Sequence, residues 1–170
     1  MRINCDEIRR RIKEEKLIEN FLDLETQLQP AGFDLTVSSV YRFYGTPRIG
    51  FYNKDRVLPE YQKIDPISRS RWWTLSEGSY HVRFHEIVNI PLDLFAESIH
   101  RSTMMRGDCE TASGYWDPGY SGAGATRLTV GKNGVHLKEG ARICQMIFTL
   151  VDPPKTGYDG RYQNENVEKK

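Results

Sequence analysis

Residues 111–122 read TASGYWDPGYSG, and this stretch predicts a tight β-hairpin that carries a single acid, Asp117. Its turn residues either free or fix the backbone, and they are Gly114, Pro118, Gly119 and Gly122. Its aromatic residues crowd the acid, and they are Tyr115, Trp116 and Tyr120. Such a loop can enclose a planar base and place the acid near a sugar. The same composition also fits an ordinary glycine and proline turn, so the rest of the chain has to decide between the two interpretations.

The composition predicts one domain that is soluble and cytoplasmic. A chain of 170 residues can bury a core without disulfides or a metal. Its 24 basic and 23 acidic residues give a net charge of +1, so no overall field would attract nucleic acid or an anionic membrane. Cys5, Cys109 and Cys144 are odd in number and lack CxxC spacing, which argues against disulfides and zinc. No apolar run reaches the roughly 18 residues of a membrane helix, and the start lacks a secretory signal.

The elements expected along the chain are one N-terminal helix and many short strands. Asn4 can cap a helix within residues 1–16 that places Ile8 and Ile12 on one face. After it, β-rich runs alternate with turn residues, and the runs are 29–37, 37–44, 49–52, 80–90, 126–130 and 142–151. This spacing predicts a mainly β sandwich, barrel or jelly roll. Residues 59–76 are interpreted as a long polar connection, and residues 152–170 as a mobile C-terminal arm outside the core.

A second group of residues carries donors that suit an anion. Residues 99–107 read IHRSTMMRG, in which Arg101 supplies a forked cation and Ser102 and Thr103 supply hydroxyls. The alternative is a helix start capped by Ser102, and the two interpretations are compatible because a helix N-terminus attracts anions. Gln145 is a conspicuous amide in an apolar strand, where it could serve a phosphate or only satisfy the backbone.

Five blocks, in their order along the chain, resemble the dUTPase and dCTP deaminase superfamily, and most closely its archaeal dUTPases. The blocks are QPAGFDLTV, RSTMMR, GYWDPGYSG, GARICQMIF and YDGRYQ, and the resemblance runs from about residue 17 to residue 167. It implies a single dUTPase-like domain over residues 1–170 with a distorted antiparallel jelly-roll fold. It also implies a homotrimer with active sites at the subunit interfaces, which takes dUTP and Mg²⁺ and has no nucleic-acid or membrane partner.

The resemblance assigns a role to individual residues. Asp117 would contact the 3′-hydroxyl of the deoxyribose and orient, as general base, the attacking water. Asp34 would support the water shell of a Mg²⁺ ion that is held mainly by the triphosphate. The phosphates would be bound by Arg101, Ser102, Thr103, Arg106 and Gln145, with Thr103 in place of the family's second serine. The base and sugar would meet the hairpin residues Gly114, Tyr115, Trp116 and Tyr120. The arm would close over the nucleotide through Tyr158, Tyr162 and Gln163.

The reaction implied is Mg²⁺-dependent hydrolysis of dUTP to dUMP and pyrophosphate, by water attack on the α-phosphorus. One alternative is dCTP deaminase, or a bifunctional deaminase and dUTPase. Deaminases of the superfamily carry a glutamate ten positions after the hairpin aspartate, where this chain has Arg127, and no acid lies between Asp117 and Glu139. An alternative of another class is a non-catalytic deoxynucleotide-binding regulator, against which Asp117, Gln145 and the arm argue.

Overall fold

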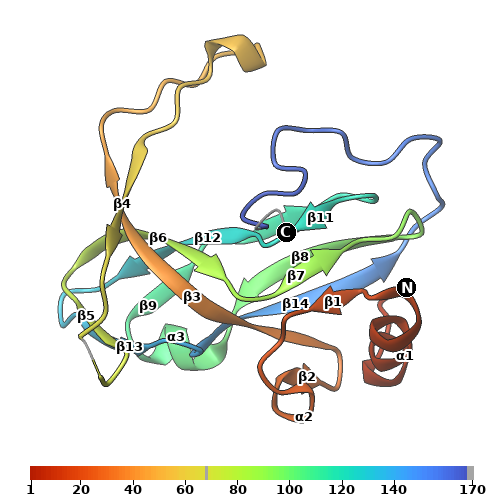
Figure 1. Ribbon diagram of the computed structural model, residues 1–170, viewed down its shortest axis with the longest axis horizontal. Coiled ribbons are helices and arrows are strands. Elements are labelled where there is room, and N and C mark those ends of the chain that lie inside the picture. The colour runs from red at the N-terminus through yellow and green to blue at the C-terminus, as the bar shows by residue number, and fades with distance from the viewer. Residues whose placement is uncertain (68, 168–170) are drawn as a thin grey trace.

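A computed structural model describes residues 1–67 and 69–167. The described chain is mainly β, and all its paired strands run antiparallel. Figure 1 shows the strands curling into one continuous body, with short helices at its margins. This confirms the predicted fold class. None of the helices in the described residues is both long and apolar enough to cross a bilayer.

The elements follow one another in a simple order. The helices are α1 (Cys5–Glu15), α2 (Leu24–Gln27) and α3 (Ser102–Arg106), with a 3-10 turn η1 (Asn53–Asp55). The strands of the first half are β1 (Ile18–Glu19), β2 (Leu28–Gln29), β3 (Gly32–Tyr44), β4 (Glu60–Ile64), β5 (Trp72–Leu75), β6 (Gly78–Phe84) and β7 (Ile87–Asn89). Those of the second half are β8 (Leu94–His100), β9 (Cys109–Thr111), β10 (Gly114–Trp116), β11 (Ser121–Gly122), β12 (Ala125–Val130), β13 (Val135–Lys138) and β14 (Arg142–Leu150).

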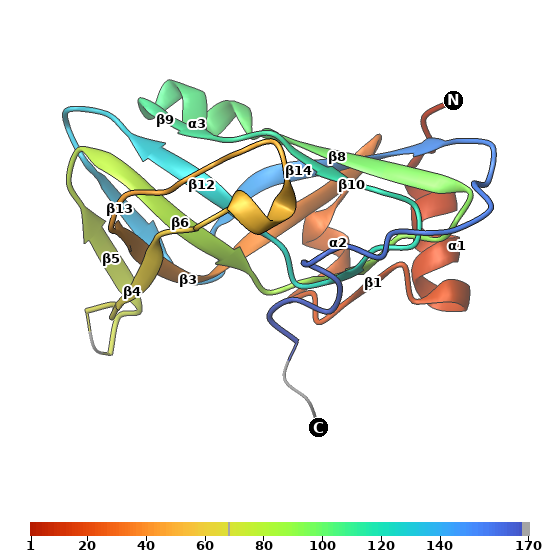
Figure 2. The ribbon, with the colours of Figure 1, turned by 90° about the horizontal axis from the view of Figure 1, so that it is seen from above.

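Strand β3 joins the two halves of the main sheet. The order of this sheet is β10-β8-β14-β3-β6-β12-β9, and two smaller sheets have the orders β1-β7-β11 and β13-β5. The first part of β3 pairs with β14 and its second part pairs with β6, with register shifts between Val37 and Ser39 and between Arg142 and Cys144. Such irregularities bend a sheet. Figure 2 shows β3 running obliquely through the middle of the molecule.

Alternating burial along the strands separates a core face from an outer face. In β12, Thr126, Leu128 and Val130 are buried, whereas Ala125, Arg127 and Thr129 are not. The interior is filled by large apolar side chains that are almost fully buried, among them Phe33, Leu35, Leu94, Leu128, Ile143 and Phe148. Because side chains of a strand point to opposite faces in turn, this pattern fixes which residues can reach a surface pocket.

The predicted N-terminal helix is confirmed as α1. The side chain of Asn4 accepts a hydrogen bond from the backbone of Glu7, and Ile8 is fully buried against the sheet. Arg11 adds a forked ion pair, because its Nη1 and Nη2 donate to Asp93 over 3.0 and 2.6 Å. Residues Asn4 and Lys16 flank the helix, as the cap signals predict.

One expectation about a connecting segment is wrong. Residues 59–76 contain the strands β4 and β5, which pair with β3 and β13. Four of the five residues of β4 are exposed, so no buried alternation marks the strand in the sequence. The arm, expected outside the core, packs Tyr158 and Tyr162 against it. Its mobility stays a prediction, and its residues 168–170 lie outside the described chain.

A buried carboxyl group ties three segments together beside β3. Glu86 is fully buried. Its Oε2 accepts from the backbone N–H of Thr36 over 2.9 Å, and its Oε1 accepts from the Thr36 hydroxyl over 2.6 Å and from Gln27 Nε2 over 2.7 Å. The Gln27 amide also donates to the backbone carbonyl of Asp34 over 2.9 Å. Burial raises the pKa of Glu86, and the hydrogen bonds from Thr36 and Gln27 act against this rise.

We expect Glu86→Gln to remove a pH dependence of stability. Because the folded-state pKa of Glu86 is raised above the ordinary 4.5, the folded protein binds more protons than the unfolded chain just above that pH. The free energy of unfolding contributed by Glu86 therefore falls as pH rises through this window. Urea denaturation from about pH 4.5 to 7 should show Glu86→Gln gaining stability relative to the parent as pH rises. Glu77→Gln, at an exposed position, is the control. A constant difference between Glu86→Gln and the parent across the range would contradict this account.

Candidate functional site

The prediction of a β-hairpin at residues 111–122 is wrong, because β10 and β11 lie in different sheets of the described chain and do not pair with each other. The segment from β10 through a tight turn to β11 instead runs antiparallel to β8 and β7, and we keep the name hairpin for this segment, residues 114–122. Strand β10 pairs with β8, so that Trp116 lies opposite Ala96, and β11 pairs with β7. The turn closes where the backbone N–H of Tyr120 donates to the carbonyl of Asp117 over 3.1 Å. Gly119 adopts a φ of 87°, which other residues resist. Asp117 stands exposed at the start of this turn.

A small cavity of about 130 Å³ opens beside the hairpin, and we name it the hairpin pocket. Its lining residues are Gly114, Tyr115, Trp116, Asp117, Tyr120, Gly124, Ala125, Tyr158, Tyr162 and Glu165. The pocket thus brings together every predicted hairpin residue and both predicted tyrosines of the arm. Trp116 and Tyr120 are 6% and 5% exposed and form its packed wall, whereas Tyr115 is 68% exposed.

The C-terminal arm lies on the hairpin of its own chain. Gln163 spans the turn, since its Nε2 donates to the carbonyl of Gly119 over 2.9 Å and its Oε1 accepts from the backbone of Ser121 over 3.0 Å. The Tyr120 hydroxyl donates to Glu165 over 2.9 Å, and burial raises the pKa of both groups. Gln163 therefore uses its amide to hold the hairpin backbone, and Tyr120 is fixed in place by the arm.

A second cavity, of about 410 Å³, gathers the predicted phosphate residues, and we name it the arginine pocket. Its lining residues are Gln29, Asp34, Ile99, His100, Arg101, Ser102, Met105 and Gln145. Register explains this grouping, because Asp34, Gln145 and Ile99 are paired across β3, β14 and β8 and so share one face of the sheet. Of the predicted phosphate residues, Thr103 and Arg106 are exposed on α3 and are not among the residues that line this cavity.

The start of α3 differs from the capped helix considered as an alternative. Ser102 is the first residue of the helix and Arg101 is its N-cap, without a side-chain capping bond. The Arg101 side chain instead turns toward β3 and β14, where it meets Asp34 and the backbone carbonyl of Arg142. Arg106 Nη1 donates to the backbone carbonyl of Ser102 over 3.3 Å. The interpretation of Ser102 as the cap is therefore wrong.

Asp34 is the buried anion of the arginine pocket. It is 1% exposed, and its Oδ2 lies 2.9 Å from Arg101 Nε and 3.2 Å from Arg142 Nη1. Burial raises the pKa of Asp34, while the charges of Arg101 and Arg142 act in the opposite direction. Its Oδ1 is buried and has no hydrogen-bond partner among the described residues. This free acceptor fits a water molecule on a cation, as the resemblance implies for Mg²⁺. The described residues contain no group of three or more His, Cys, Asp or Glu side chains placed to hold a metal.

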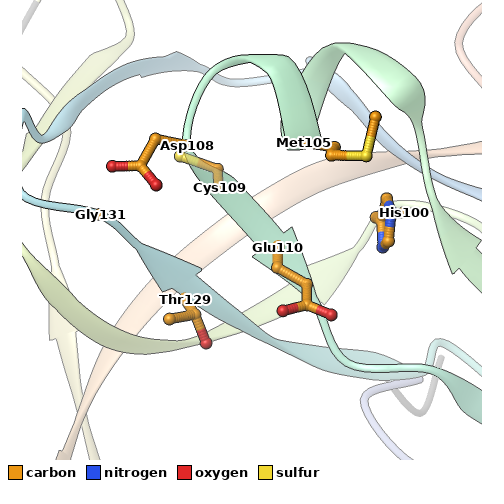
Figure 3. A pocket seen from close by; sticks show the side chains of 7 residues that line it. All are labelled: His100, Met105, Asp108, Cys109, Glu110, Thr129 and Gly131. Atoms are coloured by element: carbon orange, nitrogen blue, oxygen red, sulfur yellow. The ribbon is translucent and has the colours of Figure 1, made fainter.

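A third cavity, of about 420 Å³, adjoins the arginine pocket and shares His100 and Met105 with it. Figure 3 shows these two side chains on one side, with Asp108, Cys109 and Glu110 along the other. Burial raises the pKa of the Cys109 thiol, so this cysteine is a poor nucleophile. Its two carboxylates make this cavity less favourable for phosphate groups than the arginine pocket.

Sequence reasoning missed Arg142 and Glu165 as members of these sites. Arg142 stands in the GARICQMIF block, where a cation at the start of an apolar strand is the available signal. Its pairing with Asp34 depends on the register of β14 against β3, which the sequence does not state. Glu165 meets Tyr120 only because the arm folds back by way of the hairpin.

Comparison with known proteins places this geometry in a family. A family model described as dCTP deaminase-like matches residues 3–151. A probable deoxyuridine 5′-triphosphate nucleotidohydrolase of Archaeoglobus fulgidus is 38% identical over 167 residues, which is 98% of this chain and 98% of that protein. A protein of the same name from Methanosarcina barkeri is 40% identical over 154 residues, covering 89% of this chain and 90% of that protein.

A solved structure agrees at the level of the fold. The 2′-deoxycytidine 5′-triphosphate deaminase of Agrobacterium tumefaciens matches with a TM-score of 0.66 at 21% identity, covering 88% of this chain and 48% of that one. Because the family model covers most of the chain and the two relatives align over nearly all of it, the chain belongs to the dCTP deaminase-like family.

Proposed function

We propose that this chain is a dUTP diphosphatase that hydrolyses dUTP to dUMP and pyrophosphate in the cytoplasm. The observation that carries the proposal is the exposed carboxylate of Asp117 at the rim of a narrow aromatic pocket, in a chain that also holds Arg101 beside Gln145. The relatives named as probable dUTP nucleotidohydrolases support the same activity. The three free cysteines agree with a reducing compartment.

The active site of the proposed enzyme is completed by a second copy of the chain. The hairpin pocket and the arginine pocket have no lining residue in common among the described residues. A nucleoside triphosphate needs both at once, since one pocket fits a base and sugar and the other fits anions. A closed homotrimer in which the hairpin of one subunit faces the arginine pocket of the next supplies this arrangement three times.

In the proposed enzyme, some residues bind the nucleotide and one residue, Asp117, transfers a proton. The backbone of residues 113–115 faces the edge of uracil, and Tyr120 packs beneath the deoxyribose. Arg101, oriented by Asp34, and the hydroxyl of Ser102 hold the phosphates, with Gln145 beside them. Asp117 takes a proton from the water that attacks the α-phosphorus in line with the leaving pyrophosphate. Asp34, whose buried Oδ1 has no partner among the described residues, would help to hold a hydrated Mg²⁺, which would supply positive charge to the phosphate oxygens.

Deamination of dCTP is the alternative that the site does not favour. Arg127 occupies the outer face of β12 at the position where the superfamily's deaminases carry a glutamate. A guanidinium has donors and no acceptor, so it cannot take a proton from water. A non-catalytic regulator is disfavoured by the combination of an exposed Asp117, Gln145 and an arm that contacts the hairpin, since a regulator needs no general base. The three possibilities can be told apart by their products: a dUTP diphosphatase releases pyrophosphate, a dCTP deaminase releases ammonia, and a regulator releases neither.

The first experiment measures both products. Purified protein with dUTP and Mg²⁺ should release pyrophosphate and dUMP, and with dCTP it should release no ammonia. Asp117→Asn should keep dUTP binding and lose at least about a hundredfold in turnover, because the general base is gone. The control is Asp65→Asn, at an exposed acid outside both pockets. Ammonia from dCTP would support the deaminase, and binding of dUTP without turnover would support the regulator. An active Asp117→Asn variant would show that Asp117 is not the general base.

A mixing experiment tests the shared site. Arg101→Ala disables the arginine pocket and Asp117→Asn disables the hairpin pocket, so a homotrimer of either variant should have no complete active site and should be inactive. When the two variants are unfolded and refolded together, about a quarter of the interfaces in a random mixture combine an intact Arg101 with an intact Asp117. Pyrophosphate release should then recover to about a quarter of the parent value. Each variant refolded alone is the control. A mixture as inactive as its parts would place both residues in one subunit's site.

The arm can be tested by truncation. Removing residues 157–170 deletes the bonds of Gln163 and Glu165 to the hairpin, which fix the turn and Tyr120. Turnover of dUTP should fall by at least about tenfold, because the hairpin is no longer held and the nucleotide is no longer covered. The assembly state in gel filtration should not change. A shorter truncation of residues 168–170 keeps all of these bonds and is the control. Full activity without residues 157–170 would show that the arm has no role in the reaction.

A further inference from the structure

Arg127 lies on the same face of β12 as a residue that lines the hairpin pocket. Ala125 lines this pocket, and Arg127 follows two positions later with an exposed side chain. Side chains two apart in a strand share a face, and their Cα atoms are about 7 Å apart. The Arg127 side chain therefore begins one step along β12 from the pocket.

Backbone bonds place Arg127 at one end of the pocket. Its carbonyl accepts from the backbone N–H of Ala112 over 2.8 Å, and the hydroxyl of the preceding Thr126 donates to the carbonyl of Ala112 over 2.9 Å. Two residues after Ala112 the chain reaches Gly114, which lines the pocket together with Ala125. Residues 113–115, which are expected to face the edge of uracil, thus follow directly after a residue that is hydrogen-bonded to β12 at Thr126 and Arg127.

The guanidinium of Arg127 has unused donors. Within the part of the chain that the structure describes, it forms no ion pair and no hydrogen bond from its side chain. Its register partner on β6 is His81, and burial together with the charge of Arg83 lowers the pKa of His81 to about 4. His81 is therefore neutral near pH 7 and offers no anion. Arg83 itself lies over the ring of Tyr41, at 4.5 Å. On the other side of β12, the exposed Glu110 of β9 lies opposite Thr129, two positions from Arg127, and forms no ion pair with Arg127 in the described chain. The guanidinium therefore keeps donors for a ligand group that accepts hydrogen bonds.

We propose that Arg127 donates to the 4-carbonyl of uracil and thereby selects uracil over cytosine, an inference that rests on the proposed hydrolysis of dUTP. Uracil presents a carbonyl acceptor at this position, whereas cytosine presents an amino group whose hydrogens would face the hydrogens of the guanidinium. Because arginine has five donors and no acceptor, it cannot adapt to the amino group. Thymine has the same 4-carbonyl as uracil, so Arg127 does not separate these two bases.

A phosphate-binding role for Arg127 makes a different prediction. A cation that holds the triphosphate acts equally on every nucleotide, since all carry the same phosphates. A residue that reads the base changes the ratio between bases and leaves binding of inorganic tripolyphosphate unchanged. The ratio of kcat/KM for dUTP and dCTP, compared with that for dUTP and dTTP, separates the two roles.

The experiment uses the full chain and pyrophosphate release from dUTP, dCTP and dTTP, with tripolyphosphate as a competitive inhibitor. In Arg127→Ala the ratio of kcat/KM for dUTP over dCTP should fall by about tenfold or more. The ratio for dUTP over dTTP and the inhibition constant of tripolyphosphate should not change. Arg127→Lys, which keeps a donor, should retain more of the selectivity, and Arg127→Gln, whose amide can donate or accept, should lose it. Arg42→Ala removes an exposed arginine of β3 and is the matched control.

The outcomes are distinguishable. An unchanged ratio of dUTP over dCTP in Arg127→Ala and Arg127→Gln overturns the inference and leaves the proposed function standing. Equal losses for all three nucleotides, with weaker inhibition by tripolyphosphate, also overturn it and assign Arg127 to the phosphates. A parent protein that hydrolyses no dUTP refutes the proposed function itself. If Arg127→Ala fails to fold, the lysine and glutamine variants decide the question.

Discussion

The buried carboxylate of Asp34 is the interaction on which the arginine pocket depends. Taking a carboxylate out of water costs several kcal/mol, and here two guanidinium groups offset that cost at 2.9 and 3.2 Å. The position follows from register, because β3 places Asp34 beside Gln145 of β14, and β14 in turn pairs with β8, the strand that leads into Arg101. Breaking such a pair leaves an uncompensated charge. Arg101 is therefore held in one orientation before any ligand arrives, which reduces the entropy lost on binding.

The hairpin pocket is organised by close backbone approach, without any buried ion pair among its described residues. Gly119 has a φ of 87°, and a Cβ at this position would lie 2.7 Å from the Cα of Gly157 in the arm. Only a chain without side chains at both positions can bring the arm this close to the turn. Gln163 then satisfies backbone groups on both sides of the turn. The two halves of the proposed site are thus rigid for different reasons, one electrostatic and one steric.

The sequence predicts best where the signal is local. Asn4 and the spacing of Ile8 predict α1, and the glycines around Asp117 predict the tight turn, since caps and turns are decided by neighbouring residues. The same glycines do not reveal that the strands on either side of this turn pair with β8 and β7 and not with each other. Strand β4 was missed because its exposed residues show no alternation. The pairing of Arg142 with Asp34 joins residues 108 positions apart and depends on register. Such non-local geometry cannot be inferred from the spacing of residues along the chain.

In the proposed function, the identity of one outward residue on β12 would decide between two reactions. Every second residue of this strand faces out, so position 127 can change without disturbing Leu128 and the core behind it. A carboxylate there can accept a proton from water and an amino group's hydrogens, which suits a cytosine ring. A guanidinium can do neither, but it can donate to a carbonyl. In the proposed enzyme, Arg127 stands where deamination would need a base and offers a donor that suits uracil. The proposed loss of one reaction and the proposed preference for the substrate of the other would then follow from the same change of charge.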